Sequence, residues 1–260
     1  MEDLSLAQFR DRGYQIVRDV VDDRTIELVR SFLERAAKDA LERIRHSLPF
    51  ATIDQLLVKI DALHRTGEIE ALDPELAKLL SGHLLLAARL DPICWMAVRS
   101  RAMRGLVERL FPGQKLHMHM PPSARYVLPG NRHAMVPAHQ DITYNKHMPK
   151  FVTVWVPFVP IDECCGGVAV HVGTHKTPEM IHGERKGFWF EPIHPTRSEV
   201  VGCEVPLGGA LLLSDSIVHE SMANHSDWIR YSVDYRFFGD GGSTKHYLDL
   251  DTMEVIAPRA

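Results

Sequence analysis

The order of hydrophobic and polar residues changes near residue 115 of this 260-residue chain. Before that point apolar residues recur at helical spacing, most clearly at Ile26, Val29 and Leu33, and Asp22 or Asp23 can cap the helix that they predict. A short helix and a strand at 14–17 are expected before it. Three further segments predict helices: ATIDQLLVKIDALHRTG (51–67), DPELAKLLSGHLLLAARL (73–90) and PICWMAVRSRAMRGLVERLFPG (92–113).

Beyond residue 115, short runs of apolar and β-branched residues alternate with turn residues, and each run predicts a strand. About eight short strands in roughly 130 residues are typical of a jelly roll, the cupin-like double-stranded β-helix. An immunoglobulin-like sandwich is the alternative, but that fold needs no helical half. The expected strands are KLHMHM, ARYVLPG, FVTVWVPFV, GVAVHVG, GFWFEPI, EVVGCEVPL, GALLLSD, IVHESM and IRYSVDYRFF.

We find no internal repeat and no linker in the chain. The prediction is therefore a single domain over 1–260 that is mainly β with flanking helices. In this interpretation residues 1–114 form a mostly helical support and lid, and residues 115–245 form the β-barrel core.

Composition and charge narrow the classes of partner. The formal net charge of −4 argues against non-specific binding to nucleic acid. The acidic N-terminus has no apolar run of a secretory signal, and no stretch approaches the roughly 18 apolar residues of a membrane span. Four cysteines form no CxxC pair, so reduced thiols are expected. We expect a cytoplasmic protein that binds a small molecule, with neither nucleic acid nor membrane as partner; the sequence leaves its oligomeric state open.

Histidines and carboxylates at strand spacing suggest metal ligation. Residues i and i+2 of a strand share one face, so His139 and Asp141 present an imidazole and a carboxylate together. By itself the spacing is a weak signal, because it recurs in a chain with 15 histidines. The same spacing occurs at His182/Glu184 and His225/Asp227, and as a histidine pair at His117/His119.

Order along the chain favours one of these sets. His219 lies in a strand pattern 80 residues after His139, a gap that suits a barrel that winds through several strands before it returns. Only one histidine, His246, follows His225, and the chain between them is too short to wind through several strands. His182 lies in a polar connection without a strand pattern. We therefore prefer His139, Asp141 and His219 as a set of two histidines and one carboxylate. In non-haem Fe(II) oxygenases such a set leaves three coordination positions open.

Arg230 opens the segment RYSVDYRF, in which polar and aromatic residues alternate. One interpretation places its polar side in solvent. In the other, Arg230 points into the barrel, where a buried guanidinium needs a partner such as the carboxylate of a ligand. Asp234 is a possible partner within the chain, and the residues alone leave that alternative open. The position of Arg230 shortly after His219, on what should be the next strand, favours the inward orientation.

Taken together, these segments resemble the phytanoyl-CoA dioxygenase family of Fe(II)- and 2-oxoglutarate-dependent oxygenases. The resemblance rests on HQD followed by a strand with Trp155, on CCGGVAVHVGTHK, and on HESxxNxS with an arginine 11 residues after its histidine. The N-terminal FRDRGYQIVRDVVD is also similar to the opening strand and helix of that family. The similarity is spread over most of the chain and is weakest from about residue 40 to 110.

The resemblance implies that His139, Asp141 and His219 bind iron. It implies a reaction in which O2 and 2-oxoglutarate are used to hydroxylate, or otherwise oxidise, an unactivated C–H bond of a small molecule. Succinate and CO2 are then the co-products. Related halogenases lack the carboxylate, so Asp141 favours hydroxylation, or a related desaturation, epimerisation or ring closure, over halogenation.

The resemblance also implies a binding site for 2-oxoglutarate. Arg230 would bind its distal carboxylate, and Ser221, two residues after the distal histidine, would assist. Trp155 matches a tryptophan that lines this site in some members, and an ordinary core position is the alternative. The flanking loops offer candidate contacts for a polar or anionic substrate: Arg132, His133, Lys146 and His147.

Two other functions stay open from the sequence. The first is a cupin-type metalloprotein that uses His117, His119 and a different metal without 2-oxoglutarate; it predicts that Arg230 is dispensable. The second is a non-catalytic barrel that serves as a binding module, and it predicts no metal at His139.

Overall fold

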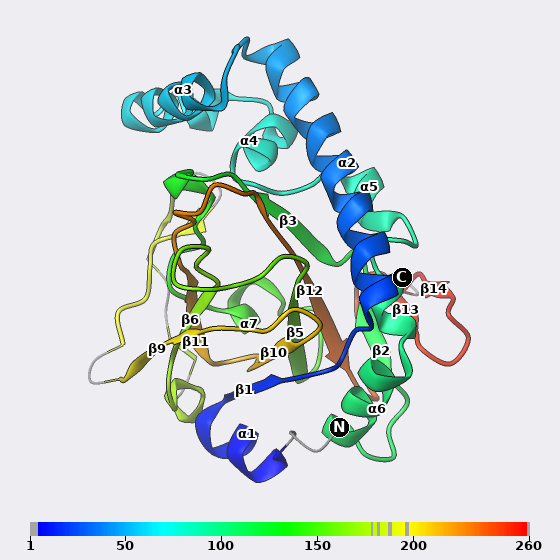
Figure 1. Ribbon diagram of the computed structural model, residues 1–260. Coiled ribbons are helices and arrows are strands. Elements are labelled where there is room, and N and C mark those ends of the chain that lie inside the picture. Colours follow the sequence, from blue (N-terminus) through cyan, green and yellow to red (C-terminus); the bar gives the residue numbers. More distant parts are fainter. Residues whose placement is uncertain (1–4, 178, 181–182, 187–188, 196–197, 259–260) are drawn as a thin grey trace.

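The structure is a computed structural model that describes residues 5–177, 179–180, 183–186, 189–195 and 198–258. Most of its α-helices lie in the first half of the chain (Figure 1). The helices are α1 (Leu6–Arg12), α2 (Asp23–Ser47), α3 (Ile53–Thr66), α4 (Pro74–Leu80), α5 (Leu86–Leu90), α6 (Arg101–Leu110) and α7 (Asp141–Tyr144), with 3-10 turns η1 (Glu68–Ala71), η2 (Met96–Arg99), η3 (Arg132–Ala134) and η4 (Thr174–Lys176).

The long helix α2 begins where the sequence predicts. The side chain of Asp22 accepts a hydrogen bond from the backbone N–H of Thr25, which satisfies one of the free donors of the first turn. Ile26, Val29 and Leu33 are buried on the face of α2 that joins the hydrophobic core. This helix therefore covers the sheet with the stripe that its spacing defines.

The segment 73–90 forms two short helices, α4 and α5, in place of the single helix expected. The break lies at Gly82, which has a φ of +83° and is therefore in the left-handed region. A Cβ at this position would lie 2.5 Å from the carbonyl oxygen of Tyr126. The helix therefore ends where the strand that carries Tyr126 passes close to its backbone.

The segment 92–113 is helical only in its second half. The helix α6 begins at Arg101, and the hydroxyl of Ser100 accepts a hydrogen bond from the N–H of Met103. The residues before Ser100 form the 3-10 turn η2 instead. This N-terminal cap competes with a longer helix, because a capping residue takes an extended conformation.

All nine segments expected to be strands contain one. The strands are β1 (Tyr14–Val17), β2 (His117–His119), β3 (Ser123–Val127), β4 (His139–Gln140), β5 (Phe151–Pro157), β6 (Val168–His171), β7 (Arg185–Lys186), β8 (Trp189–Phe190), β9 (Val200–Cys203), β10 (Ala210–Ser214), β11 (Val218–Ser221), β12 (Arg230–Phe238), β13 (Tyr247–Asp249) and β14 (Val255–Ile256). The sequence pattern does not predict β7, β13 or β14, and it indicates β4 only through the strand spacing of His139 and Asp141.

The strands form two main antiparallel sheets, which confirms the expected jelly-roll class of mainly β structure with flanking helices (Figure 1). The larger sheet has the order β1-β10-β5-β12-β2-β13-β14, with β3 also paired to β12, and the smaller has the order β4-β11-β6-β9. The strands β7 and β8 pair separately. Because β1, β13 and β14 belong to the larger sheet, that sheet extends beyond the expected 115–245 segment at both ends.

The strand β12 separates the core from the interior of the barrel. Its aromatic and aliphatic positions, Tyr231, Val233, Tyr235 and Phe237, are buried in the same core as the apolar face of α2. Its polar positions lie on the opposite face and line a cavity between the two sheets. The helices therefore cover the outside of the larger sheet and leave its inner face for the cavity.

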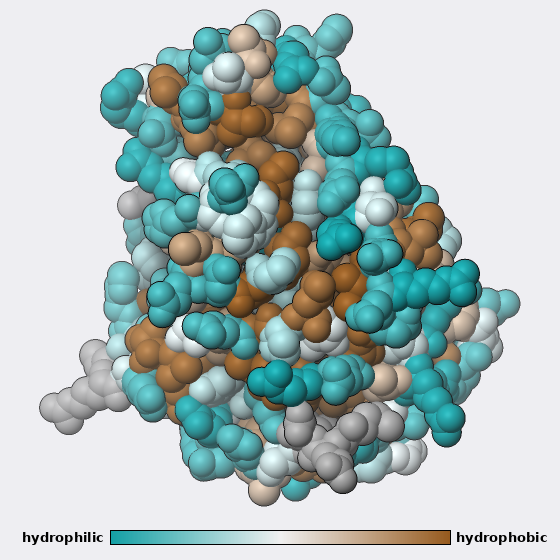
Figure 2. Space-filling model, in the orientation of Figure 1, coloured by the Kyte–Doolittle hydropathy of each residue, from teal (hydrophilic) through white to brown (hydrophobic). Residues whose placement is uncertain are grey.

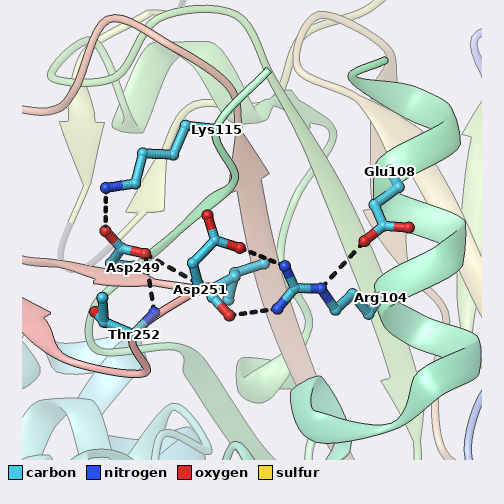
Figure 3. Close-up of polar contacts among 7 residues, drawn as sticks. Arg104, Glu108, Lys115, Asp249, Asp251 and Thr252 are labelled. Carbon is cyan, nitrogen blue, oxygen red and sulfur yellow. Dashed lines mark hydrogen bonds and ion pairs between the residues drawn. The ribbon is translucent and has the colours of Figure 1, made fainter. Parts of the chain in front are cut away.

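The C-terminal hairpin of β13 and β14 is tied to α6 by polar contacts (Figure 3). Arg104 donates to the carbonyl of Leu250 at 2.6 Å and forms an ion pair with Asp251. The buried carboxylate of Asp249 pairs with Lys115 at 2.5 Å and accepts from the N–H of Asp251 at 2.9 Å. These contacts fix the outer edge of the sheet on the helical layer.

On the face seen in Figure 1, hydrophilic residues lie around the outline and hydrophobic residues gather in the middle (Figure 2).

Within the described residues, no helix combines the length and the apolar character that crossing a membrane requires.

Candidate metal centre

Two neighbouring strands bring the preferred histidines together. His139 on β4 and His219 on β11 are register partners in the smaller sheet, and their ring centroids lie 4.3 Å apart. Asp141 follows β4 directly, as the first residue of α7. One ligand atom from each of the three side chains lies within 4.8 Å of the others, and all three residues are buried. The arrangement can hold a metal ion, as the sequence analysis expected.

Hydrogen bonds fix the orientation of both imidazole rings. The Nδ1 of His139 is 2.8 Å from the carbonyl oxygen of Pro137, and the Nδ1 of His219 is 3.1 Å from that of Ile217. A carbonyl only accepts, so each Nδ1 carries the proton and each Nε2 presents a lone pair. Burial, together with the neighbouring His139, lowers the pKa of His219 to about 4. At neutral pH this ring is therefore in the form that binds metals.

Two side chains that the sequence analysis did not assign hold the carboxylate of Asp141. The hydroxyl of Thr153 on β5 donates to Oδ2 at 2.5 Å, and Arg236 on β12 donates to Oδ1 at 2.9 Å. Burial opposes ionisation, but the positive charge of Arg236 outweighs it and keeps the pKa of Asp141 well below its usual value. The acidic ligand is therefore ionised and its orientation is fixed, as metal ligation requires.

Arg230 is buried and points into the barrel, with 3% of its surface exposed. Its Nη1 donates to the backbone carbonyls of Gly166, Gly167 and Met222, whereas its Nε is buried without a hydrogen-bond partner. The backbone of Gly166 itself lies close to that of Ala223. A Cβ at position 166 would lie 2.5 Å from the carbonyl oxygen of Ala223, so only glycine allows these two backbone segments to approach so closely. Burial lowers the pKa of Arg230 to about 10, which still leaves it charged at neutral pH.

The inner face of β12 carries Arg230, Ser232, Asp234 and Arg236 in a row. Asp234 lies 3.8 Å from Arg236 and forms no ion pair with Arg230 within the described part of the chain. The alternative in which Asp234 neutralises Arg230 is therefore not what the structure shows. The alternation of β12 was the available signal for Arg236, since it shares a face with Arg230.

The site residues surround one cavity of about 530 Å³ that reaches both sheets. Trp155, of which 5% is exposed, lies opposite Asp234 in the register of β5 and β12 and lines the cavity. Ser221, at the end of β11, also lines it. Arg230, Ser221 and Trp155 therefore lie in the same cavity as the three candidate metal ligands.

The other histidine pairs do not assemble into a metal cluster among the described residues. His117 packs against the rings of Phe238 and Tyr247, and His119 lines the cavity, with its Nδ1 3.3 Å from the Nε2 of His147. His225 and Asp227 are exposed at the surface. The remaining pair, His182/Glu184, includes a residue outside the described ones.

The four loop residues proposed as substrate contacts have separate surroundings. Arg132 and His133 both contact Asp61, and Lys146 forms an ion pair with Glu179 at 3.0 Å. None of these three lines the cavity. The fourth, His147, does not line the cavity itself but contacts His119, which does.

Comparison with known proteins places the chain in a family. The family model described as phytanoyl-CoA dioxygenase (PhyH) matches residues 9–232, which confirms the resemblance inferred from the sequence. A search of curated proteins found no match.

Several solved structures share the fold. EvdO2 from Micromonospora carbonacea var. aurantiaca, complexed with 2-oxoglutarate, is 16% identical with a TM-score of 0.59, and the match covers 95% of each chain. The epimerase SnoN, in complex with Fe3+, alpha ketoglutarate and nogalamycin RO, is 17% identical with a TM-score of 0.59 over 90% of this chain and 81% of SnoN. The non-heme monooxygenase ThoJ is 16% identical with a TM-score of 0.58 over 92% of this chain and 79% of ThoJ.

Proposed function

The chain belongs to the phytanoyl-CoA dioxygenase family, and from that premise we propose that it is an Fe(II)- and 2-oxoglutarate-dependent oxygenase. It hydroxylates, or otherwise oxidises, an unactivated C–H bond of a small-molecule substrate, with succinate and CO2 as co-products. One observation carries the proposal. A cluster of two histidines and one carboxylate shares a cavity with a buried arginine that has no carboxylate partner among the described residues.

The residues present fit a divalent iron ion. His139 and His219 offer Nε2 lone pairs, and Asp141 offers an ionised oxygen that keeps further lone pairs beside its bonds to the protein. The His139 Nε2 and the Asp141 Oδ1 are 3.7 Å apart, a separation that two ligands of one ion can have. Three ligands of this kind leave positions for a chelating co-substrate and for O2.

The residues present also fit 2-oxoglutarate. Arg230 has a buried Nε without a partner, and a planar guanidinium binds a carboxylate through two parallel hydrogen bonds. A second nitrogen, Nη1, is fixed by backbone carbonyls, so the charged head does not have to be ordered when the ligand binds. In the proposal Ser221 assists Arg230 with its hydroxyl, and Trp155 forms an apolar wall of the site.

Iron, when bound, supplies the oxidising chemistry, for which 2-oxoglutarate and O2 are the reagents. The chain contributes binding, orientation and the exclusion of water. Thr153 and Arg236 keep the Asp141 carboxylate ionised and fixed, and the two strand histidines hold their Nε2 atoms toward the same point. The burial of all three ligands separates the reacting centre from bulk water.

Anaerobic titration tests the proposal. Fe(II) and 2-oxoglutarate are added to the protein without O2, and the weak visible charge-transfer band of an iron–keto-acid chelate is followed. We expect the band in the wild type. Arg230→Gln should need at least about tenfold more 2-oxoglutarate to reach the same intensity, because a charge-assisted pair of hydrogen bonds is lost. Arg230→Lys should recover only part of the affinity, since an ammonium lacks the planar fork.

The matched control is Arg132→Gln, which removes an exposed arginine that pairs with Asp61 outside the cavity. Its titration should coincide with that of the wild type. Iron binding without the band would contradict the use of 2-oxoglutarate and return the search to the cupin-type alternative. Absence of iron binding would favour the non-catalytic barrel.

A further inference from the structure

The cavity holds more positive charge than the proposed cofactors use. Five cationic side chains line it, and they face three carboxylates. A divalent metal and a doubly charged 2-oxoglutarate cancel each other, so that the surplus remains when both are bound. The cations are Arg89, Arg125, Arg230, Arg236 and Lys245; the carboxylates are Asp141, Glu220 and Asp234.

Three of the five cations have no assigned role, and one of them, Lys245, is exposed to solvent. Arg236 pairs with Asp141 and Asp234, and Arg230 is assigned to 2-oxoglutarate. Arg125 and Arg89 form no ion pair with any carboxylate of the described chain, and the Nε of each is buried without a hydrogen-bond partner. A buried positive charge without a carboxylate partner is costly, so a site of this kind favours an anion from outside the protein.

Arg125 faces the interior of the barrel beside Arg230. It lies on β3 opposite Ser232, one inward-facing position along β12 from Arg230, and only 7% of its surface is exposed. Diagonal neighbours of this kind on one face lie roughly 7–8 Å apart. Its Nη2 donates to the carbonyl of Ser81 at 2.8 Å, so the guanidinium is held in place. Its Nε has no hydrogen-bond partner and can donate to a ligand.

The other half of this region is apolar. The guanidinium of Arg125 lies 5.3 Å from the centre of the Trp189 ring, and Leu86 of α5 and Met120 line the same cavity. Arg89 comes from α5 as well, one helical turn from Leu86. A ligand that satisfies both features has an anionic group and a hydrocarbon part.

We infer that Arg125 and Arg89 form a second anion subsite, distinct from that of 2-oxoglutarate, which binds a carboxylate or phosphate group of the organic substrate. The inference rests on the proposed function, since it assigns Arg230 to the co-substrate. The anionic group anchors the substrate at the α5 and β3 side of the cavity, and the hydrocarbon part extends along Leu86, Met120 and Trp189. The substrate is therefore an organic acid or an organic phosphate.

Binding under anaerobic conditions tests the subsite without turnover. The protein is loaded with Fe(II) and saturating 2-oxoglutarate, and calorimetry measures the affinity for hexanoate, hexyl phosphate and the neutral hexanamide. We expect at least one of the two anions to bind about tenfold or more tightly than hexanamide, because a charge-assisted hydrogen bond is worth more than a neutral one. The preferred anion identifies the group as carboxylate or phosphate.

Three variants assign the effect to residues. Arg125→Gln and Arg89→Gln should each lower the affinity for the preferred anion about tenfold and leave the affinity for hexanamide unchanged. Arg125→Lys should keep part of the affinity for the anion. The affinity for 2-oxoglutarate, read from the charge-transfer band, should stay within about twofold of the wild-type value in all three variants. Arg132→Gln serves again as the control outside the cavity.

Arg125 also supports the fold through the carbonyls of Ser81 and Ala134, whereas the buried Nε of Arg89 has no hydrogen-bond partner in the described part of the chain. Arg89→Gln therefore keeps the test decisive if Arg125→Gln does not fold. Equal binding of anions and hexanamide, or unchanged anion binding in Arg89→Gln, would overturn the subsite. Loss of 2-oxoglutarate affinity in Arg125→Gln would assign both arginines to the co-substrate and overturn it too. Absence of the charge-transfer band in the wild type would overturn the proposed function and, with it, the inference.

Discussion

His139 and His219 are direct register partners on adjacent antiparallel strands, and their ring centroids are 4.3 Å apart. Each donates its Nδ1 proton to a backbone carbonyl two residues earlier in its own chain segment, that of Pro137 or Ile217. The two strands therefore provide the same local geometry twice. Both Nε2 atoms are directed to one side by the backbone itself, before any metal is present.

The first prediction concerns the metal. His219→Ala should abolish tight binding of Fe(II), because two remaining ligands do not complete the facial set. His225→Ala is the matched control, since it removes an exposed histidine six residues further along the chain. Anaerobic calorimetry with Fe(II) measures both variants. Equal affinity of His219→Ala and the wild type would mean that the ion binds elsewhere.

The second prediction concerns the support of the carboxylate ligand. Thr153→Val keeps the shape of the side chain and removes the hydroxyl that donates to the Asp141 Oδ2. Loss of such a supporting hydrogen bond commonly lowers metal affinity by about 10- to 100-fold, and we expect a decrease in that range. Thr66→Val, on the exposed end of α3, should leave the affinity unchanged. An unchanged affinity in Thr153→Val would show that Arg236 alone fixes the carboxylate.

A comparison of Asp141 with Thr153 shows which part of the site could be predicted from the sequence. The His-x-Asp spacing and the strand pattern around His219 are local features, so the three candidate ligands could be selected from the chain alone. That Thr153 and Arg236 hold Asp141 depends on which face of β5 and β12 the helices cover, and this is decided by tertiary packing. The break at Gly82 has the same origin, because a distant strand approaches the backbone there.

The third prediction concerns stability and pH. Burial lowers the pKa of His119 to about 3, and burial together with Lys245 and Arg236 lowers that of His147 to about 4, against 6.5 for an ordinary histidine. As pH falls below 6.5, the unfolded chain takes up protons that the folded protein does not, so stability is full above pH 6.5 and decreases toward pH 4. Urea unfolding across this range should show the decrease.

The variants His119→Gln and His147→Gln measure the share of this pH dependence that the pair contributes beside other buried histidines such as His219. Each should reduce the loss of stability between pH 6.5 and 4, because a glutamine takes up no proton in either state. His46→Gln, in the last turn of α2, is the exposed control and should leave the slope as in the wild type. A slope that stays the same in all three variants would assign the acid sensitivity to other groups.

The last prediction concerns the C-terminal hairpin. The Asp249 carboxylate is buried, pairs with Lys115 and accepts from the N–H of Asp251, whereas Glu108 contacts Arg104 at the surface (Figure 3). Asp249→Ala should lower the free energy of unfolding by about 1–2 kcal/mol, because it leaves backbone donors without their acceptor. Glu108→Ala should change it by less than about 1 kcal/mol, as is usual for an exposed ion pair. Urea denaturation at neutral pH compares the two, and equal effects would mean that the hairpin adds little to the stability of the sheet.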